Sequence, residues 1–273
     1  PYQGVNFIQI IIFIPYRVTL MELNPIKFMM LEHFPLMRVI SMKLGYCLQK
    51  KIVLWLFPSI GKNWIYKDLV MKISVFGLGY VGCVSVACLS KNNHSVIGLD
   101  IDKNKIDLIN DGKSTIIEKD IDEIIEMGVK NKLISATSDT IKTIQDTDVS
   151  FICVGTPNLS TGMLDMSGIF KVAEIIGEGL KNKTNYHTII IRSTVMPGTY
   201  DMVSEIITQI SNKKRDKDFG IVLNPEFLRE GSAVHDFYNP PYTVLSTTSD
   251  ISMSIIEDIF SFIDAPIHRV EIG

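Results

Sequence analysis

The chain has 273 residues, of which 46% are hydrophobic, and a formal net charge of −3 at pH 7. This length allows one large domain or two small ones, and the apolar content is sufficient for a core. Residues 1–70 carry 8 Lys and Arg against 3 Asp and Glu (net +5), whereas the remainder carries 19 against 27 (net −8). The acidic second part argues against a nucleic-acid-binding protein, which normally shows a basic patch.

The first 70 residues form an extension unlike the rest of the chain. Its apolar runs, 10–14 and 52–57, are well short of the roughly 20 residues that a membrane-spanning helix needs, and no signal-peptide pattern surrounds them. Three interpretations stay open: a stretch upstream of the natural protein, a fused fragment, or a peripheral membrane contact through aromatic and basic residues. We favour the first, and expect residues 1–70 to be non-native or poorly ordered, without a stable core.

From Lys72 to Asp100 the chain has the order of parts of a dinucleotide-binding βαβ unit. A buried strand, 73–76, is followed by a glycine loop, an apolar helix-like segment, a second strand, 95–99, and an acidic residue. The loop and its acidic partner comprise Gly77, Gly79, Tyr80, Val81, Gly82 and Asp100.

Each part of such a unit has a physical task. Gly77 permits a sharp turn, Gly79 leaves room for a pyrophosphate, and Gly82 allows the helix to pack closely on the sheet. Asp100 can accept hydrogen bonds from both hydroxyls of an adenosine ribose, and its charge repels a 2′-phosphate, so NAD is favoured over NADP. The alternatives are a structural glycine turn, or a loop that binds FAD or S-adenosylmethionine.

Beyond residue 100, helices and strands alternate. The patterns predict helices over 103–110, 121–127, 165–181 and 252–263, with another beginning near 197–198. They predict strands over 133–136, 149–154, 187–192, 219–223 and 242–245. This alternation predicts a doubly wound parallel α/β sheet, a Rossmann-like domain spanning 71–273.

Polar residues follow several of these strands, at the carboxyl edge where such sheets bind ligands. They are Thr156, Thr194 and the segment from Asn224 to Glu230. Structural interpretations compete: Thr194 as a helix N-cap, Glu226 and Glu230 as solvated charges in a first helical turn, and Arg229 as a plain surface residue.

The four cysteines and five histidines show neither metal-ligand spacing nor a disulfide pattern. No metal site is therefore expected. We interpret Cys83, Cys88 and Cys153, which lie in predicted apolar elements, as small core residues.

Five motifs follow one another in the second part of the chain. They are FGLGYVG at 76–82, FICVGTP at 151–157, RSTVMPGT at 192–199, NPEFLREG at 224–231 and NPPYTV at 239–244. With these motifs, residues 71–273 resemble the amino-terminal, NAD-binding half of the UDP-glucose/GDP-mannose 6-dehydrogenase family of nucleotide-sugar dehydrogenases. RSTVMPGT, NPPYTV and the segment 264–267 look more like the GDP-mannose branch, with the UDP-glucose branch as the alternative.

The resemblance implies an oxidoreductase that oxidises carbon 6 of a nucleotide sugar, GDP-mannose to GDP-mannuronate, with two NAD and a cysteine thioester. It implies that Thr194 and Glu230 are catalytic, orienting a water or moving its proton, and that Glu226, Phe227, Leu228 and Arg229 contact the sugar. It also implies Asp100 and Lys105 at the adenosine ribose, with Thr156, Thr194 and Glu230 beside the nicotinamide.

Such enzymes continue into a central helix and a sugar-binding domain that carries the catalytic cysteine in a Gly-Gly-Ser-Cys motif. None of the four cysteines here lies in such a motif. We therefore expect an NAD-binding half that is inactive alone, monomeric where the full family is homodimeric, cytoplasmic, and without nucleic-acid or membrane partners. The family's Pro-Gly after Glu118 is replaced by Lys119-Asp120, which leaves that loop's conformation open.

Two other classes of function stay open. The first is a different nicotinamide enzyme, such as a 3-hydroxyacid dehydrogenase, which would lack NPEFLREG. The second is a non-catalytic NAD-binding module.

Overall fold

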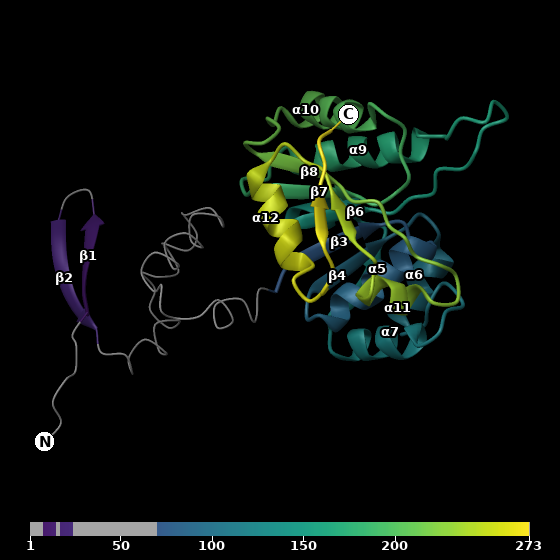
Figure 1. Ribbon diagram of the computed structural model, residues 1–273, viewed down its shortest axis with the longest axis horizontal. Helices are drawn as coiled ribbons and strands as arrows, with labels where there is room; N and C mark the ends of the chain where they lie inside the picture. The colour runs from purple at the N-terminus through teal and green to yellow at the C-terminus, as the bar shows by residue number, and fades with distance from the viewer. Residues whose placement is uncertain (1–7, 15–16, 24–69, 273) are drawn as a thin grey trace, which may run out of the picture. The chain divides into compact units, whose positions relative to one another are not determined.

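The computed structural model describes residues 8–14, 17–23 and 70–272, and the chain divides into two units, Pro1–Ile60 and Gly61–Gly273. In the first unit, β1 (Ile8–Ile14) pairs antiparallel with β2 (Arg17–Leu23) (Figure 1). The apolar run at 52–57 lies outside the described residues. Among those that are described, no helix combines the length and apolar character needed to cross a bilayer.

The second unit contains one six-stranded sheet in which all neighbouring strands are parallel. Its order is β5-β4-β3-β6-β7-β8. The strands are β3 (Lys72–Phe76), β4 (Ser95–Leu99), β5 (Ile134–Thr137), β6 (Val149–Ile152), β7 (His187–Ile191) and β8 (Phe219–Leu223). The strand order reverses between β3 and β6, as in a doubly wound sheet, and confirms the predicted fold class.

Helices connect these strands, and the predicted ones are present, the helix at 103–110 with the predicted bounds and the others with ends shifted by a few residues. They are α5 (Tyr80–Lys91), α6 (Lys103–Asn110), α7 (Ile121–Lys130), α8 (Thr140–Asp146), α9 (Ser167–Leu180), α10 (Thr199–Ser211), α11 (Ala233–Tyr238) and α12 (Asp250–Ile259). The sequence patterns did not predict α8 and α11, which are too short to show a helical period. A small parallel pair, β9 (Thr243–Leu245) and β10 (Ile267–Arg269), completes the unit, and β10 was also not predicted.

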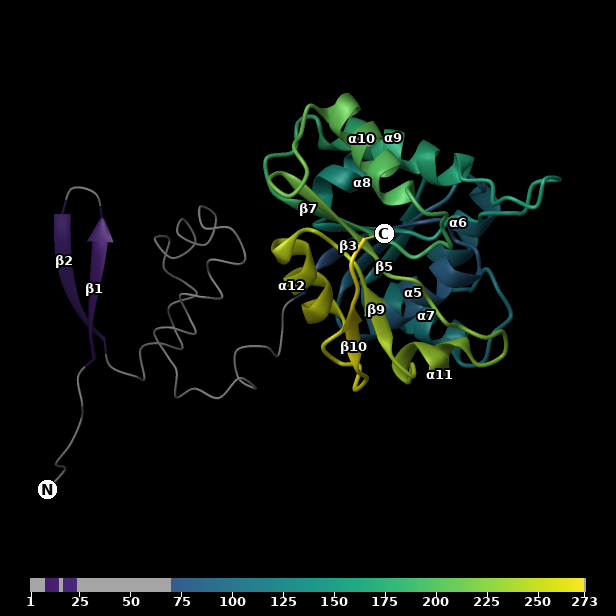
Figure 2. The same cartoon turned by 45° about the horizontal axis from the view of Figure 1, so that its top comes forward.

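The sheet is covered on both faces (Figure 2). Helices α8, α9 and α10 lie on one face, and α5, α7 and α11 on the other. Consecutive residues of a strand point to opposite faces of the sheet. Ile152 therefore packs in the core cluster with α9 and α10, whereas Phe151 points to the other face. There its ring centroid lies 6.5 Å from that of Phe260, the residue after α12. This double coverage explains why the central strands are almost wholly apolar.

A chain of polar side chains crosses the buried sheet. The Ser74 and Ser150 hydroxyls are 2.7 Å apart, and Ser150 Oγ lies 2.8 Å from His187 Nε2. Burial, followed by the nearby charge of Lys183, lowers the pKa of His187 to about 3. His187 is therefore neutral in the folded protein at neutral pH.

This burial predicts a pH-dependent stability. The pKa of His187 is about 3 when folded and about 6.5 when unfolded, so between these values only the unfolded chain binds the proton. The free energy of unfolding should fall as pH drops from about 6.5, by up to about 1.4 kcal/mol per pH unit. His187→Gln should flatten this slope in urea denaturation between about pH 7 and pH 5. His235→Gln, at an exposed histidine, is the control, and equal slopes in wild type and His187→Gln would contradict the assignment.

Candidate functional site

The loops with the predicted site residues meet at one edge of the sheet. They follow β3, β4, β6, β7 and β8, and parallel strands place their carboxyl ends on the same side. At the centre, the backbone N–H of Cys153 donates to the carbonyl of Phe76 at 2.8 Å, which brings the loops after β3 and β6 together. The candidate site therefore lies at the point where the strand order reverses.

The glycine loop is shaped by close approaches of the backbone. Gly77 has a φ of +94°, and a Cβ there would lie 2.9 Å from the carbonyl oxygen of Cys153. A Cβ on Gly82 would lie 1.7 Å from the carbonyl oxygen of Gly77. At Gly79 a Cβ would meet nothing within 4 Å. Two of the glycines are thus required by packing, whereas the third borders open space.

That open space lies at the amino-terminal end of α5. Gly79 is the N-cap of the helix, no side chain caps it, and the first turn of this described helix contains no acidic residue. The first backbone N–H groups of a helix carry a partial positive charge and favour an anion. The loop therefore offers a diphosphate both space and favourable electrostatics.

Asp100, at the end of β4, holds the glycine loop from the side. Its Oδ2 accepts a hydrogen bond from the N–H of Leu78 at 2.7 Å, and its Oδ1 accepts one from the N–H of Asp102 at 2.9 Å. Burial acts to raise the pKa of Asp100, but the hydrogen bonds from Asp102 and Leu78, with the charge of Lys105, lower it. Lys105 Nζ lies 3.5 Å from Oδ2.

The carboxylate of Asp100, whose side chain is 9% exposed, retains acceptor capacity for a ligand. Each carboxylate oxygen has two lone pairs, so two backbone donors leave further acceptor capacity. The ionised group directly follows β4, which neighbours β3 in the sheet. These residues fit an adenine dinucleotide, with the diphosphate at Gly79 and ribose hydroxyls at Asp100.

The loop after β7 is hydrogen-bonded to the loop after β6. Ser193 Oγ donates to the carbonyl of Val154 at 2.6 Å, a contact that the sequence analysis missed. Thr194 is exposed and Thr156 partly exposed on these two joined loops. The interpretation of Thr194 as an N-cap is wrong, because α10 begins at Thr199 and its N-cap is Gly198.

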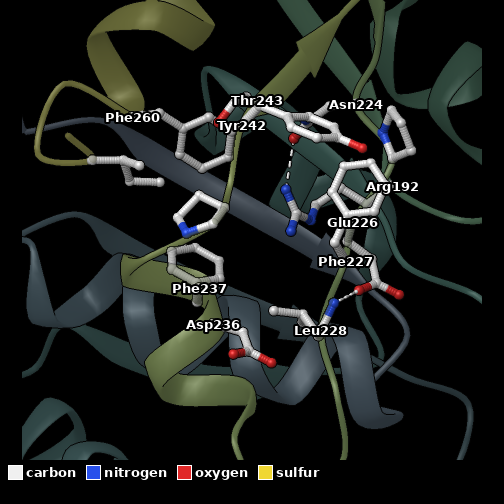
Figure 3. Close-up of a pocket in the computed structure, with 13 residues that line it drawn as sticks. Arg192, Asn224, Glu226, Phe227, Leu228, Asp236, Phe237, Tyr242, Thr243 and Phe260 are labelled. Atoms are coloured by element: carbon white, nitrogen blue, oxygen red, sulfur yellow. Dashed lines mark hydrogen bonds between the residues drawn. The ribbon is translucent and has the colours of Figure 1, made fainter. Parts of the chain in front are cut away.

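The segment 224–230, after β8, is not helical (Figure 3). The interpretation of Glu226 and Glu230 as charges in a first helical turn is therefore wrong, since the next helix begins at Ala233. Glu226 instead accepts a hydrogen bond from the N–H of Leu228 at 2.5 Å. Glu230 is exposed at the carboxyl edge.

Arg229 is exposed yet firmly paired. Its Nε and Nη2 donate to the two carboxylate oxygens of Asp236 at 2.9 and 2.8 Å. This pairing, opposed by burial and supported by Ser232, holds the pKa of Asp236 well below its ordinary value. The sequence analysis did not identify Asp236 as the partner of Arg229. The only signal was its position seven residues after Arg229.

A small hollow adjoins this loop and opens to solvent. Figure 3 shows the Arg192 guanidinium at its centre, donating from Nη1 to Asn224 Oδ1 at 2.6 Å. The Arg192 Cζ lies 5.6 and 5.7 Å from the ring centroids of Phe237 and Phe260, and burial lowers the pKa of Arg192. The remaining labelled lining includes Phe227, Leu228, Tyr242 and Thr243. Sequence analysis did not single out Arg192.

The loop that departs from the family's Pro-Gly pattern keeps a tight turn. Asp120 adopts a left-handed conformation with a φ of 64° and is the N-cap of α7. Asp tolerates this region better than most residues other than glycine. Asp120 is therefore compatible with the turn that leads into α7.

Comparisons with known proteins agree with this geometry. The family described as "UDP-glucose/GDP-mannose dehydrogenase family, NAD binding domain" matches residues 71–264. GDP-mannose 6-dehydrogenase of Pseudomonas savastanoi pv. phaseolicola is 44% identical over 204 residues, covering 74% of this chain and 47% of that protein. The enzyme of the same name from Pseudomonas aeruginosa is 46% identical over 200 residues, covering 73% of this chain and 46% of that protein.

A solved structure is similar over the same region. A ternary complex of GDP-mannose dehydrogenase from Pseudomonas aeruginosa superposes with a TM-score of 0.73 at 45% identity, covering 74% of this chain and 47% of that one. The chain thus spans about half the length of the curated relatives that it matches.

The glycine geometry predicts opposite outcomes for two alanine variants. Gly82→Ala should lower the free energy of unfolding by about 3 kcal/mol or more, because its Cβ collides with backbone. Gly79→Ala should change it by less than about 1 kcal/mol, because the Cβ meets open space. Urea denaturation midpoints measure both effects, and similar stabilities for the two variants would contradict the packing role of Gly82.

Proposed function

We propose a function from the premise that the chain belongs to the UDP-glucose/GDP-mannose dehydrogenase family, whose NAD-binding domain it matches over residues 71–264. The domain binds NAD, and the protein to which it belongs oxidises carbon 6 of a nucleotide sugar. The observation that carries the proposal is the carboxylate of Asp100, hydrogen-bonded at 2.7 Å to Leu78 inside the glycine loop. A negative charge beside the glycine loop supports a ribose site at Asp100.

NAD supplies the acceptor for the hydride that leaves carbon 6. The chain's own residues bind and orient it: Gly79 leaves space for the diphosphate, and Asp100, with Lys105 beside it, receives the ribose hydroxyls. The ionised Asp100 disfavours the 2′-phosphate of NADP. Thr156 and Thr194, on the joined loops after β6 and β7, would border the nicotinamide.

Thr194 and Glu230 are the proposed catalytic residues. Both are exposed at the carboxyl edge, on loops that the 2.6 Å hydrogen bond between Arg192 and Asn224 ties together. A Glu carboxylate in this place can accept a proton from a water or hydroxyl, and the Thr hydroxyl can orient it. Glu226, Phe227, Leu228 and Arg229 lie on the same loop and would contact the sugar.

The nucleophile of a thioester step is not among the described cysteines. Cys83, Cys88 and Cys153 are buried and free. Burial raises the pKa of Cys88 to about 12 and that of Cys153 to about 11, which suppresses the reactive thiolate. We propose that a cysteine elsewhere in the protein serves this step, and that these unpaired thiols favour a reducing compartment such as the cytoplasm.

GDP-mannose is the substrate that we favour, because the relatives at 44% and 46% identity carry the name GDP-mannose 6-dehydrogenase. UDP-glucose is the alternative within the family. A non-catalytic NAD-binding module is the alternative from another class, since the chain spans only about half of those relatives.

The ribose role of Asp100 can be tested by cofactor selectivity. Asp100→Ala should weaken NAD binding about 10- to 100-fold, because charged hydrogen bonds contribute about 1.5–3 kcal/mol. NADP binding should change far less, since its 2′-phosphate gains from losing the charge. Asp107→Ala, on the exposed face of α6, is the control in calorimetric titrations of both cofactors. Equal losses for NAD and NADP would contradict the role.

The proposed reaction is tested on the protein with all sequence that its gene encodes around these 273 residues. GDP-mannose should give two NADH per sugar, followed by absorbance, at a rate well above that with UDP-glucose. Glu230→Gln should lower kcat about 100-fold or more, whereas Glu205→Gln, on the exposed surface of α10, should not. NAD binding without turnover of any nucleotide sugar would instead support the non-catalytic module.

A further inference from the structure

The loop between α6 and α7 touches two parts of the candidate site that are far apart in sequence. Thr115 Oγ1 donates to the carbonyl of Leu78, in the glycine loop, at 2.8 Å. Three residues further on, Glu118 Oε2 accepts a hydrogen bond from the Tyr80 hydroxyl and another from the N–H of Gly231 at 2.8 Å. One carboxylate oxygen therefore joins the start of α5 to the end of the loop after β8.

At this contact the pKa values of Glu118 and Tyr80 are shifted in opposite directions. Burial acts to raise the pKa of Glu118, but the Tyr80 hydroxyl and the N–H groups of Gly231, Lys119 and Ala233 lower it. Burial, and then Glu118, raise the pKa of Tyr80 well above its ordinary value. Tyr80 thus stays a donor and Glu118 an ionised acceptor, and such charge-assisted hydrogen bonds are stronger than neutral ones.

The two donors stand next to residues of the proposed chemistry. Tyr80 is the first residue of α5 and follows Gly79, at the proposed diphosphate site. Gly231, with a φ of +85°, directly follows Glu230. Tyr80 also donates to the carbonyl of Arg229 at 3.3 Å, so it contacts the residue on the other side of Glu230.

The loop after β8 is also held on either side of Glu230, because the N–H of Arg229 donates to Asp236 Oδ2 and the N–H of Ser232 donates to the carbonyl of Arg229, both at 3.1 Å. Its amino-terminal end is fixed by Asn224, which donates to the carbonyl of Val244 at 3.0 Å, and Arg229 is fixed by Asp236. The segment 224–230 contains neither helix nor strand. The direction of the Glu230 side chain therefore depends on how the backbone at 229–231 is held.

We propose that Glu118 is a positioning residue that couples cofactor binding to the placement of Glu230. It acts through the Tyr80 hydroxyl on one side and the Gly231 N–H on the other. The inference rests on the proposed function, because it takes NAD as the ligand of the glycine loop and Glu230 as the catalytic group. A diphosphate that orders the start of α5 would thereby order the residues around Glu230.

The first test measures hydrogen exchange at Gly231 by NMR, with and without NAD. In the wild type, NAD should slow exchange of this amide about tenfold or more. Glu118→Gln keeps the side-chain shape and loses the charge, so it should speed exchange about tenfold without NAD and abolish the NAD-dependent protection. Glu123→Gln, on the exposed side of α7, should behave like the wild type.

A second variant keeps the test valid if Glu118→Gln lowers the unfolding midpoint. Tyr80→Phe removes one hydroxyl and leaves the bond between Glu118 and Gly231, so it should retain most protection without NAD and lose the NAD-dependent part. In the full protein, Glu118→Gln should lower kcat at least tenfold while the KM for NAD changes less than threefold, which a general loss of structure would not produce.

The outcomes separate the two proposals. NAD-dependent protection of Gly231 that is equal in wild type, Glu118→Gln and Tyr80→Phe would overturn the coupling and leave NAD binding intact. An absence of NAD binding by the wild type would overturn the proposed function, and this inference with it.

Discussion

Strand β3 pairs in parallel with β4 on one side and with β6 on the other, so that Ser74 lies opposite both Ile97 and Ser150. This register brings the carboxyl ends of the three strands to one level. The backbone then continues the pairing beyond the sheet: Gly77 donates to the carbonyl of Leu99, and Cys153 to that of Phe76, both at 2.8 Å. Both neighbouring strands thus hold the backbone at the point where the glycine loop turns.

Two ionised carboxylates hold the resulting loop from different directions. Asp100 accepts the N–H of Leu78, and Glu118 accepts the hydroxyl of Tyr80, the residue after Gly79. Neighbouring donors lower the pKa of both carboxylates. Negative charge beside the loop suits ribose hydroxyls and repels an additional phosphate, whereas the helix start between them suits a diphosphate. Under the proposed function, the contacts that shape the loop would therefore also favour NAD over NADP.

Long and regular elements were predictable. The helix at 103–110 and the strand at 219–223 were predicted with the bounds that the structure shows, because each has a clear local pattern. Helices α8 and α11, of 7 and 6 residues, were not, because they are too short for a period to emerge. Glu226 and Glu230, four apart, suggested a helical turn, but the segment is not helical, and Asn224 at its start is held by contacts with Arg192 and Val244.

The sequence by itself determined the order of strands and helices along the chain, the glycines of the loop and the acidic residue that follows β4. These depend on local backbone freedom and on the alternation of apolar residues, which neighbouring positions encode. Only the tertiary structure decided which loops meet. Glu118 lies 38 residues from Tyr80 and 113 from Gly231, and no periodicity connects positions so distant. Their contact follows from the order of the strands within the sheet, which depends on the packing of the whole domain.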